Sequence, residues 1–189
     1  MRRLLVPLLA VALIAVLVIG LTQAGSKSEQ PESAPKFDLQ AAQRQLEGSP
    51  PKLAALHAQA SEILDSGFDK RLAALKGQPV VINKWASWCR PCRAEFPVFQ
   101  QVATDRGKEI AFVGVNAADK RPAAEKFLAE RPLPYPSYED PNEKIAQDLK
   151  IPKFFPMTLM IAADGKTFIK SGEYTSRADL EADIDKYLG

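Results

Sequence analysis

From residue 68 onward, apolar and polar positions follow one another in the order expected of an α/β domain. Short runs of apolar, β-branched residues are typical of buried strands, and they occupy residues 79–84, 110–116 and 157–162. Asp164-Gly165 is a hairpin-turn signal, so residues 166–170 are expected to form a returning antiparallel strand. Helical spacing and capping residues predict helices, the first short or extended, at residues 71–75, 89–105, 122–130, 140–149 and 176–188.

A proline-rich loop is predicted at residues 131–136. Early strands that are separated by helices are expected to run parallel, and the hairpin adds an antiparallel pair. The predicted fold class is therefore α/β, with a mixed β-sheet sandwiched by helices over residues 68–189. This range has enough apolar sequence to form a domain of its own.

Residues 37–67 form a second region, which is predicted to be a helical prelude to the domain. Asp38 is placed to cap a short helix that continues to Leu46, and the glycine and prolines of residues 48–51 end that helix. After this break, apolar residues recur at helical spacing as far as Leu64, which predicts a second, amphipathic helix. Residues 25–36 are polar, rich in Ser, Glu and Pro, and are expected to form a flexible linker.

The first 24 residues are predicted to be a transmembrane signal-anchor. Leu4 to Leu21 is an apolar run, interrupted only by Pro7, and Arg2 and Arg3 precede it. Such a run spans roughly 27 Å as a helix, close to the ~30 Å of a bilayer core. Since positive charge stays in the cytoplasm, the rest of the chain is expected to be extracytoplasmic, on a single-pass membrane protein. The alternative is a cleaved signal peptide and a secreted domain.

Charge and composition exclude several classes of function. The 25 Lys and Arg residues are scattered among 23 Asp and Glu residues, for a net charge of +2. No basic block or stripe is present, so nucleic acid is not expected as a partner. The only histidine is His57, which argues against a His-based catalytic triad or a multi-histidine metal site. No metal site is predicted.

The chain has two cysteines, and they form the motif Cys89-Arg90-Pro91-Cys92 between a predicted strand and a predicted helix. That context is typical of a redox motif. Cys89 would lie at a helix N-terminus, where the helix dipole and unpaired N–H groups favour the reactive thiolate. Arg90 and Arg93 add positive charge, Pro91 fixes the start of the helix, and Cys92 would be the more buried, resolving thiol.

Other interpretations of this cysteine pair fit the sequence less well. A zinc site would need a second pair of Cys or His ligands, and covalent haem attachment would need histidine where Arg93 stands. Two unreactive core cysteines remain an alternative. The redox-active disulfide Cys89–Cys92 is expected to carry the electrons itself, and no cofactor is predicted.

The segment NKWASWCRPCRAEFP, from Asn83 to Pro97, resembles the thioredoxin-like superfamily and, more narrowly, its TlpA/ResA/CcmG-like branch of membrane-anchored or exported thiol–disulfide oxidoreductases. The resemblance covers roughly residues 68–189 and implies a thioredoxin-like fold. Many members carry a short β-element ahead of the first strand, whereas residues 37–64 of this chain are predicted to be helical.

The resemblance also implies roles for individual residues. Ordinary thioredoxins have a buried Asp where this chain has Asn83, and the branch instead has an acid at the position of Glu95. Glu95 is therefore expected to have a raised pKa and to exchange a proton with Cys92. Phe155-Pro156 matches the cis-proline loop that faces the disulfide and binds substrate. Trp88 matches the aromatic residue beside the reactive sulfur, so it is also expected to contact substrate.

The branch acts mostly as reductases that are supplied with electrons by a thiol-carrying membrane protein, and its best-known task is reducing apocytochrome c. The resemblance thus implies a protein-disulfide reductase for exported substrates. The positive charge near Cys89 favours the opposite direction, a thiol oxidase or isomerase. A redox-switched binding module is a third hypothesis. A peroxidase would need a lone peroxidatic cysteine with nearby Thr and Arg, which the sequence lacks.

Overall fold

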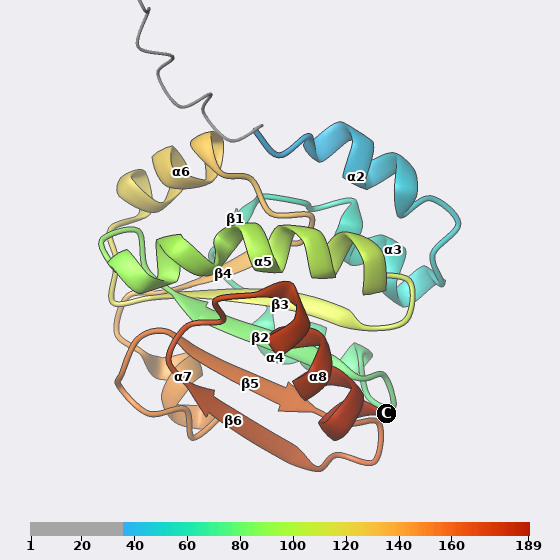
Figure 1. Ribbon diagram of the computed structural model, residues 1–189. Helices are drawn as coiled ribbons and strands as arrows, with labels where there is room; N and C mark the ends of the chain where they lie inside the picture. Colours follow the sequence, from blue (N-terminus) through green and yellow to red (C-terminus); the bar gives the residue numbers. More distant parts are fainter. Residues whose placement is uncertain (1–35) are drawn as a thin grey trace, which may run out of the picture. The chain divides into compact units, whose positions relative to one another are not determined.

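The computed structural model describes residues 36–189, and residues 37–189 form one compact unit (Figure 1). The predicted signal-anchor at residues 1–24 lies outside the described residues, as does the predicted linker at 25–36 except for Lys36. Between residues 36 and 189, no helix combines the length and the apolar character that crossing a membrane requires.

A six-stranded mixed sheet forms the centre of the unit, in the order β1-β4-β3-β2-β5-β6. The pairs β1–β4, β4–β3 and β3–β2 are parallel, whereas β5 is antiparallel to both β2 and β6. This topology confirms the predicted mixed sheet with a C-terminal hairpin. The strands are β1 (Ile63–Leu64), β2 (Val80–Trp85), β3 (Ala111–Ala117), β4 (Ser137–Asp140), β5 (Met157–Ile161) and β6 (Thr167–Ser171).

Helices cover both faces of this sheet. One apolar core contains residues of α5, α6 and α8, and the other contains residues of α3, α4 and α7. Figure 1 shows α5 and α8 lying across the same face, with α2 beside α5. The helices are α2 (Leu39–Gln45), α3 (Pro51–His57), α4 (Phe68–Ala74), α5 (Arg90–Arg106), α6 (Arg121–Glu130), α7 (Lys144–Asp148) and α8 (Arg177–Leu188).

The central strand β2 determines where the candidate site lies. All six of its residues are buried, because helices cover it on both faces and strands flank it on both sides. Side chains alternate between the faces of a strand. Val81 and Trp85 pack in the core under α5, while Val80 and Ile82 pack in the opposite core. Asn83 shares a face with the first pair, and Lys84 shares a face with the second.

The second, amphipathic helix predicted in residues 37–67 is present as α3, but the predicted continuation to Leu64 is wrong. The helix α3 ends at His57, and the apolar pair Ile63–Leu64 forms β1, which pairs in parallel with β4 at the edge of the sheet. The apolar spacing continued past the helix because Ile63 is buried in the core as a strand residue. A short β-element therefore precedes the central strand, as the resemblance implied.

The sequence pattern also missed β4 and placed the start of α7 too early. Ser137, Glu139 and Asp140 are polar, so the segment has no strand-like apolar run. Each of these side chains has a hydrogen-bonding or ion-pair partner in the structure. The Ser137 hydroxyl accepts from the Trp85 indole (3.1 Å), Glu139 pairs with Arg121 (3.1 Å), and Asp140 accepts from the N–H groups of residues 145 and 146 (3.1 and 2.9 Å). The polar strand is thus stabilised by its hydrogen-bond partners.

Candidate active site

Cys89 and Cys92 form a disulfide at the end of the central strand, where the chain turns into α5. Cys89 is the N-cap residue of that helix, and its Sγ accepts a hydrogen bond from the backbone N–H of Cys92 (3.2 Å). In this oxidised form, Cys89 is only 3% exposed and Cys92 is fully buried. An anion on Cys89 would be stabilised by the helix N-terminus and by this N–H group. Cys89 thus lies at the helix N-terminus, as predicted, and both cysteines are buried in this oxidised form.

Arg90, Pro91 and Arg93 occupy the first turn of α5. Arg90 and Pro91 are its first two residues, where proline is tolerated because no intrahelical partner is needed. The Arg90 side chain is exposed. Arg93 instead donates to the Ser87 carbonyl (3.3 Å) and lies 4.9 Å from the ring centroid of Phe127. Its positive charge is therefore used to fix the turn that precedes the cysteines.

The turn before the cysteines is held by Asp119, a residue that the sequence analysis did not single out. Its carboxylate accepts from the backbone N–H and the hydroxyl of Ser87 (2.5 and 3.0 Å) and from the Asn116 amide (2.9 Å). Asp119 follows β3, so it connects the end of that strand to the turn after β2. The sequence alone gave no signal for this contact, because 32 residues separate the partners.

Glu95 is buried one helical turn beyond Cys92. Its Oε1 accepts from the Asn83 amide (2.8 Å), and its Oε2 accepts from the backbone N–H of Tyr174 (3.2 Å). Burial away from water raises the pKa of Glu95 to about 8, although both hydrogen bonds favour the charged form and oppose this rise. The raised pKa was expected from the resemblance. A carboxyl group with this pKa is able to accept or donate a proton near neutral pH.

Asn83 is suited to either protonation state of Glu95. Its Nδ2 donates to the carboxylate, while its Oδ1 is buried without a hydrogen-bond partner. Because a side-chain amide carries both a donor and an acceptor, a rotation of the amide would let Oδ1 accept from a protonated Glu95. An aspartate at this position would lack that donor when ionised. The pair is therefore able to hold a proton without placing two charges side by side.

Trp88 lies beside the Phe155–Pro156 pair, although it precedes the pair by more than 60 residues in the sequence. The rings of Trp88 and Phe155 pack edge to face with centroids 5.1 Å apart, and the Phe155–Pro156 peptide bond is cis, as expected. Trp88 is 59% exposed, and its indole N–H donates to the carbonyl of Ala118 (2.9 Å). Phe154 is 72% exposed. The structure thus presents an apolar surface formed by the residue before Cys89 and by the loop before β5.

Lys84 and Glu143 form a buried ion pair on the other face of β2, and the sequence analysis overlooked both. The Nζ of Lys84 lies 2.6 Å from Oε2 of Glu143, and the lysine side chain is fully buried. A signal for Lys84 was present, since it is the one charged residue within the apolar run of residues 79–86. Lysine is almost never fully buried unless it is paired. A lysine in a buried strand therefore predicts a carboxylate partner elsewhere in the chain.

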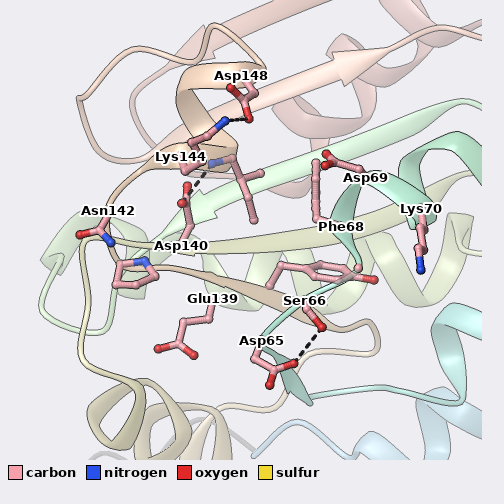
Figure 2. Close-up of a pocket in the computed structure, with 14 residues that line it drawn as sticks. Asp65, Ser66, Phe68, Asp69, Lys70, Glu139, Asp140, Asn142, Lys144 and Asp148 are labelled. Atoms are coloured by element: carbon pink, nitrogen blue, oxygen red, sulfur yellow. Dashed lines mark hydrogen bonds and ion pairs between the residues drawn. The ribbon is translucent and has the colours of Figure 1, made fainter.

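A separate pocket of about 510 Å³ lies between α4, the end of β4 and α7 (Figure 2). Its wall includes several acidic side chains, and the disulfide is not part of its lining. Asp140 caps α7, and Asp148 pairs with Lys144 (2.5 Å), so these carboxylates already have partners. Figure 2 shows Asn142 and Lys144, the two neighbours of Glu143, at this pocket.

Comparisons with known proteins agree with this geometry. Residues 33–186 match the Redoxin family model. The chain is 38% identical over 122 residues to the thiol:disulfide interchange protein CycY of Rhizobium leguminosarum bv. viciae, which covers 62% of this chain and 64% of that protein. It is 31% identical over 97 residues to the thiol-disulfide oxidoreductase ResA of Oceanobacillus iheyensis, over 51% of this chain and 50% of that protein. The matched part is thus less than two thirds of the length of either relative.

Solved structures show the same likeness. The crystal structure of a putative thiol:disulfide interchange protein DsbE from Chlorobium tepidum superposes with a TM-score of 0.56 at 32% sequence identity. The superposition covers 62% of this chain and 85% of that one. A secreted disulfide oxidoreductase of Mycobacterium tuberculosis gives a TM-score of 0.55 at 26% identity, over 60% of this chain and 85% of that one. The fold is therefore thioredoxin-like.

Proposed function

The chain belongs to the redoxin family, and we propose that it is an extracytoplasmic thiol–disulfide oxidoreductase that exchanges electrons with exported proteins. The observation that carries the proposal is the Cys89–Cys92 disulfide at the N-terminus of α5, one turn from a buried carboxyl group whose pKa lies near 8. Once the disulfide is reduced, this combination supplies an electron pair, a stabilised thiolate and a proton acceptor in one place.

In the reducing direction, the Cys89 thiolate attacks one sulfur of a substrate disulfide. A mixed disulfide forms, and the other substrate sulfur leaves as a thiolate. Cys92 then loses its proton and attacks the Cys89 sulfur, which releases the second substrate thiolate. The electron pair has passed from the dithiol of this chain to the substrate. The product is the Cys89–Cys92 disulfide that the structure contains.

Glu95 accepts the proton of Cys92 in this scheme and returns it to solvent or to the leaving thiolate. The carboxyl group lies three residues after Cys92 on the same helix, and residues at this spacing share a helix face. Its raised pKa keeps a proton available below about pH 8 and makes the carboxylate a usable base above it. Asn83 and the Tyr174 N–H position the group in both states.

The substrate's cysteine segment lies on the surface formed by Trp88 and Phe155, whereas Pro156, also predicted to bind substrate, is buried behind Phe155. Trp88, next to Cys89 in the chain, supplies exposed apolar area, and Phe154 exposes more in the loop before β5. Exposed aromatic residues bind apolar side chains of a partner. Arg90 is exposed beside Cys89 and contributes positive charge. A polypeptide disulfide is therefore the substrate class, and no small-molecule cofactor takes part.

The direction of electron flow is reductive in our proposal, with an apocytochrome c as the exported substrate and a dithiol protein of the membrane as the electron source. The names of the relatives support thiol–disulfide exchange as the reaction, and the reductive direction and the substrate follow from the resemblance of residues 83–97. The N-terminal residues 1–24 tether the protein to the membrane as a single-pass anchor. Because outer compartments oxidise thiols, a reductase there needs a donor that carries electrons across the membrane.

Replacing the attacking cysteine gives the direct test. We expect Cys89→Ala in the full chain, purified in detergent, to abolish reduction of insulin disulfides by dithiothreitol above the uncatalysed rate. Cys92→Ala should instead accumulate a mixed disulfide, because Cys89 still attacks and nothing resolves the product. A Cys89→Ala protein with wild-type turnover would contradict the assignment of the nucleophile.

One observation favours the opposite direction as a second candidate. The Cys92 N–H, the helix N-terminus and Arg90 all stabilise a thiolate on Cys89, and a stabilised reduced form makes the disulfide a stronger oxidant. The reduction potential separates the two. A value at or below about −220 mV supports the reductase, whereas a value near about −120 mV indicates an oxidase or isomerase of exported proteins.

A further inference from the structure

We propose that the buried Lys84–Glu143 ion pair is a positioning device for the substrate-binding loop at residues 152–155. The inference rests on the proposed function, because it gives the loop a role in holding a polypeptide substrate. It assigns Lys84 and Glu143 as positioning residues, which act through Phe155 and Trp88 and do not touch the reacting sulfurs. Sequence patterns point to neither residue's role.

Lys84 reaches the loop with a fully satisfied ammonium group. Besides Glu143, its Nζ donates to the backbone carbonyls of Pro152 (2.9 Å) and Phe154 (3.4 Å). An ammonium group has three N–H donors and no acceptor, so each of its protons has a partner here. Two of the three bonds end on the loop. A neutral side chain of similar length would leave both carbonyls without this donor.

Lys84 also contacts the aromatic ring of Phe155, which packs against Trp88. Its Nζ lies 4.2 Å from the ring centroid of Phe155, a distance at which a cation is attracted to the ring face. Phe155 packs edge to face against Trp88, which flanks Cys89. In the β2–β5 pairing, Lys84 lies opposite Met157, the residue after Pro156. The contacts thus run from Lys84 through Phe155 to Trp88.

Glu143 adopts a backbone conformation that is costly for its residue type. It has φ 55° and ψ 28°, in the left-handed region that favours glycine. Its side chain is 16% exposed and points its Oε2 at Lys84, whereas its neighbours Asn142 and Lys144 line the separate pocket of Figure 2. Glutamate at this strained position therefore needs a reason, and the ion pair with Lys84 provides one.

Stability alone is a weak explanation for such a pair. Removing two charges from water costs free energy that their attraction often only balances, and apolar replacements of buried ion pairs are frequently neutral or stabilising. Ile82, two residues earlier on the same face, packs in an apolar core. An apolar side chain at position 84 would continue that core. What it would not supply is a donor to the carbonyls of the loop.

The test compares a polypeptide substrate with a small one. We expect the double variant Lys84→Met/Glu143→Gln, as full chain in detergent, to raise the KM for insulin disulfides about tenfold while kcat changes less than about twofold. Reaction of the reduced variant with 5,5′-dithiobis(2-nitrobenzoate) should stay within about twofold of wild type, because this reagent needs no bound loop. Lys144→Met, which removes an exposed lysine of α7, is the matched control and should change none of these values.

Hydrogen exchange gives a second readout that does not depend on turnover. Amide exchange in residues 153–155 should become about tenfold faster in the double variant and stay unchanged in Lys144→Met. A folded double variant with wild-type KM and wild-type exchange would overturn the proposal. If the wild-type chain fails to reduce polypeptide disulfides, the proposed function is wrong, and the exchange rates still decide whether the pair orders the loop. Should the double variant not fold, Lys84→Met/Glu143→Gly, which also relieves the left-handed backbone at residue 143, must produce the same two changes.

Discussion

Two consecutive residues of the central strand, Asn83 and Lys84, point to opposite faces of the sheet, and each faces a carboxyl group, that of Glu95 fully buried and that of Glu143 partly buried. On the side of α5, Glu95 is surrounded by neutral donors, the Asn83 amide and the Tyr174 N–H. On the other side, Glu143 faces the ammonium group of Lys84. The comparison shows that the partner of a buried carboxyl group decides its use.

A carboxyl group among neutral donors remains free to titrate. Hydrogen bonds stabilise the Glu95 carboxylate, but they do not offset the loss of hydration, so its pKa rises to about 8. The Glu143 carboxylate instead lies 2.6 Å from the fully buried ammonium group of Lys84, and removing one partner of such a pair leaves the other charge uncompensated. The first arrangement serves proton transfer. The second serves to hold a segment of chain in place.

The largest effect is expected from removing the titratable group with Glu95→Gln. Between the usual pKa of 4.5 and about 8, folded Glu95 keeps a proton that the unfolded chain has released. The free energy of unfolding therefore falls as pH rises through this window, by a total on the order of 5 kcal/mol. Glu95→Gln should lack this loss. At pH 9 the oxidised variant is expected to be the more stable protein, as measured by urea unfolding.

Asn83 makes this substitution structurally mild. A glutamine amide can donate to the unpartnered Oδ1 of Asn83 and still accept from the Tyr174 N–H. At pH 4.5 the variant and the wild type should thus unfold at similar urea concentrations. Parallel stability curves from pH 4.5 to pH 9 would show that Glu95 does not hold a proton in the folded state.

The next effect comes from breaking the ion pair on the other face. Lys84→Met should lower the free energy of unfolding by about 3–5 kcal/mol, because Glu143 and two loop carbonyls lose their buried partner. Adding Glu143→Gln should recover about 1–3 kcal/mol of that loss, since the uncompensated charge is gone. Equal and additive losses in the two single variants and the double variant would mean that the pair has no coupling. Urea unfolding of all three at pH 7 completes the cycle.

Sequence patterns predicted the parts of the molecule that depend on local periodicity and on one motif. Strands β2, β3 and β5 were predicted because their apolar runs are nearly continuous, and β6 because the hairpin turn Asp164-Gly165 precedes it. The redox pair was predicted because Cys89 and Cys92 lie between a strand and a helix. The strand β4 escaped because its polar side chains are satisfied by partners distant in sequence.

The residues of the candidate site also fall into those that the sequence pointed to and those that it did not. The resemblance pointed to Glu95, Trp88 and the Phe155–Pro156 loop, whose positions in the structure agree with that expectation. Asp119 and Glu143 escaped, because their partners, Ser87 and Lys84, lie 32 and 59 residues away. Only Lys84 carried a visible signal, a charge in a buried strand, and that signal names no partner.

The smallest effect separates the charge of Glu143 from its backbone. Glu143→Gln and Glu143→Gly both remove the carboxylate, but only glycine relieves the left-handed conformation at φ 55°. Since that conformation costs a side-chain-bearing residue roughly 1 kcal/mol, the glycine variant should be the more stable of the two by about that amount. Asn142→Gly, at the adjacent residue, is the matched control and should bring no such gain. If the glutamine variant proves equally stable, the backbone at Glu143 is not strained, and the ion pair is not needed to explain a glutamate there.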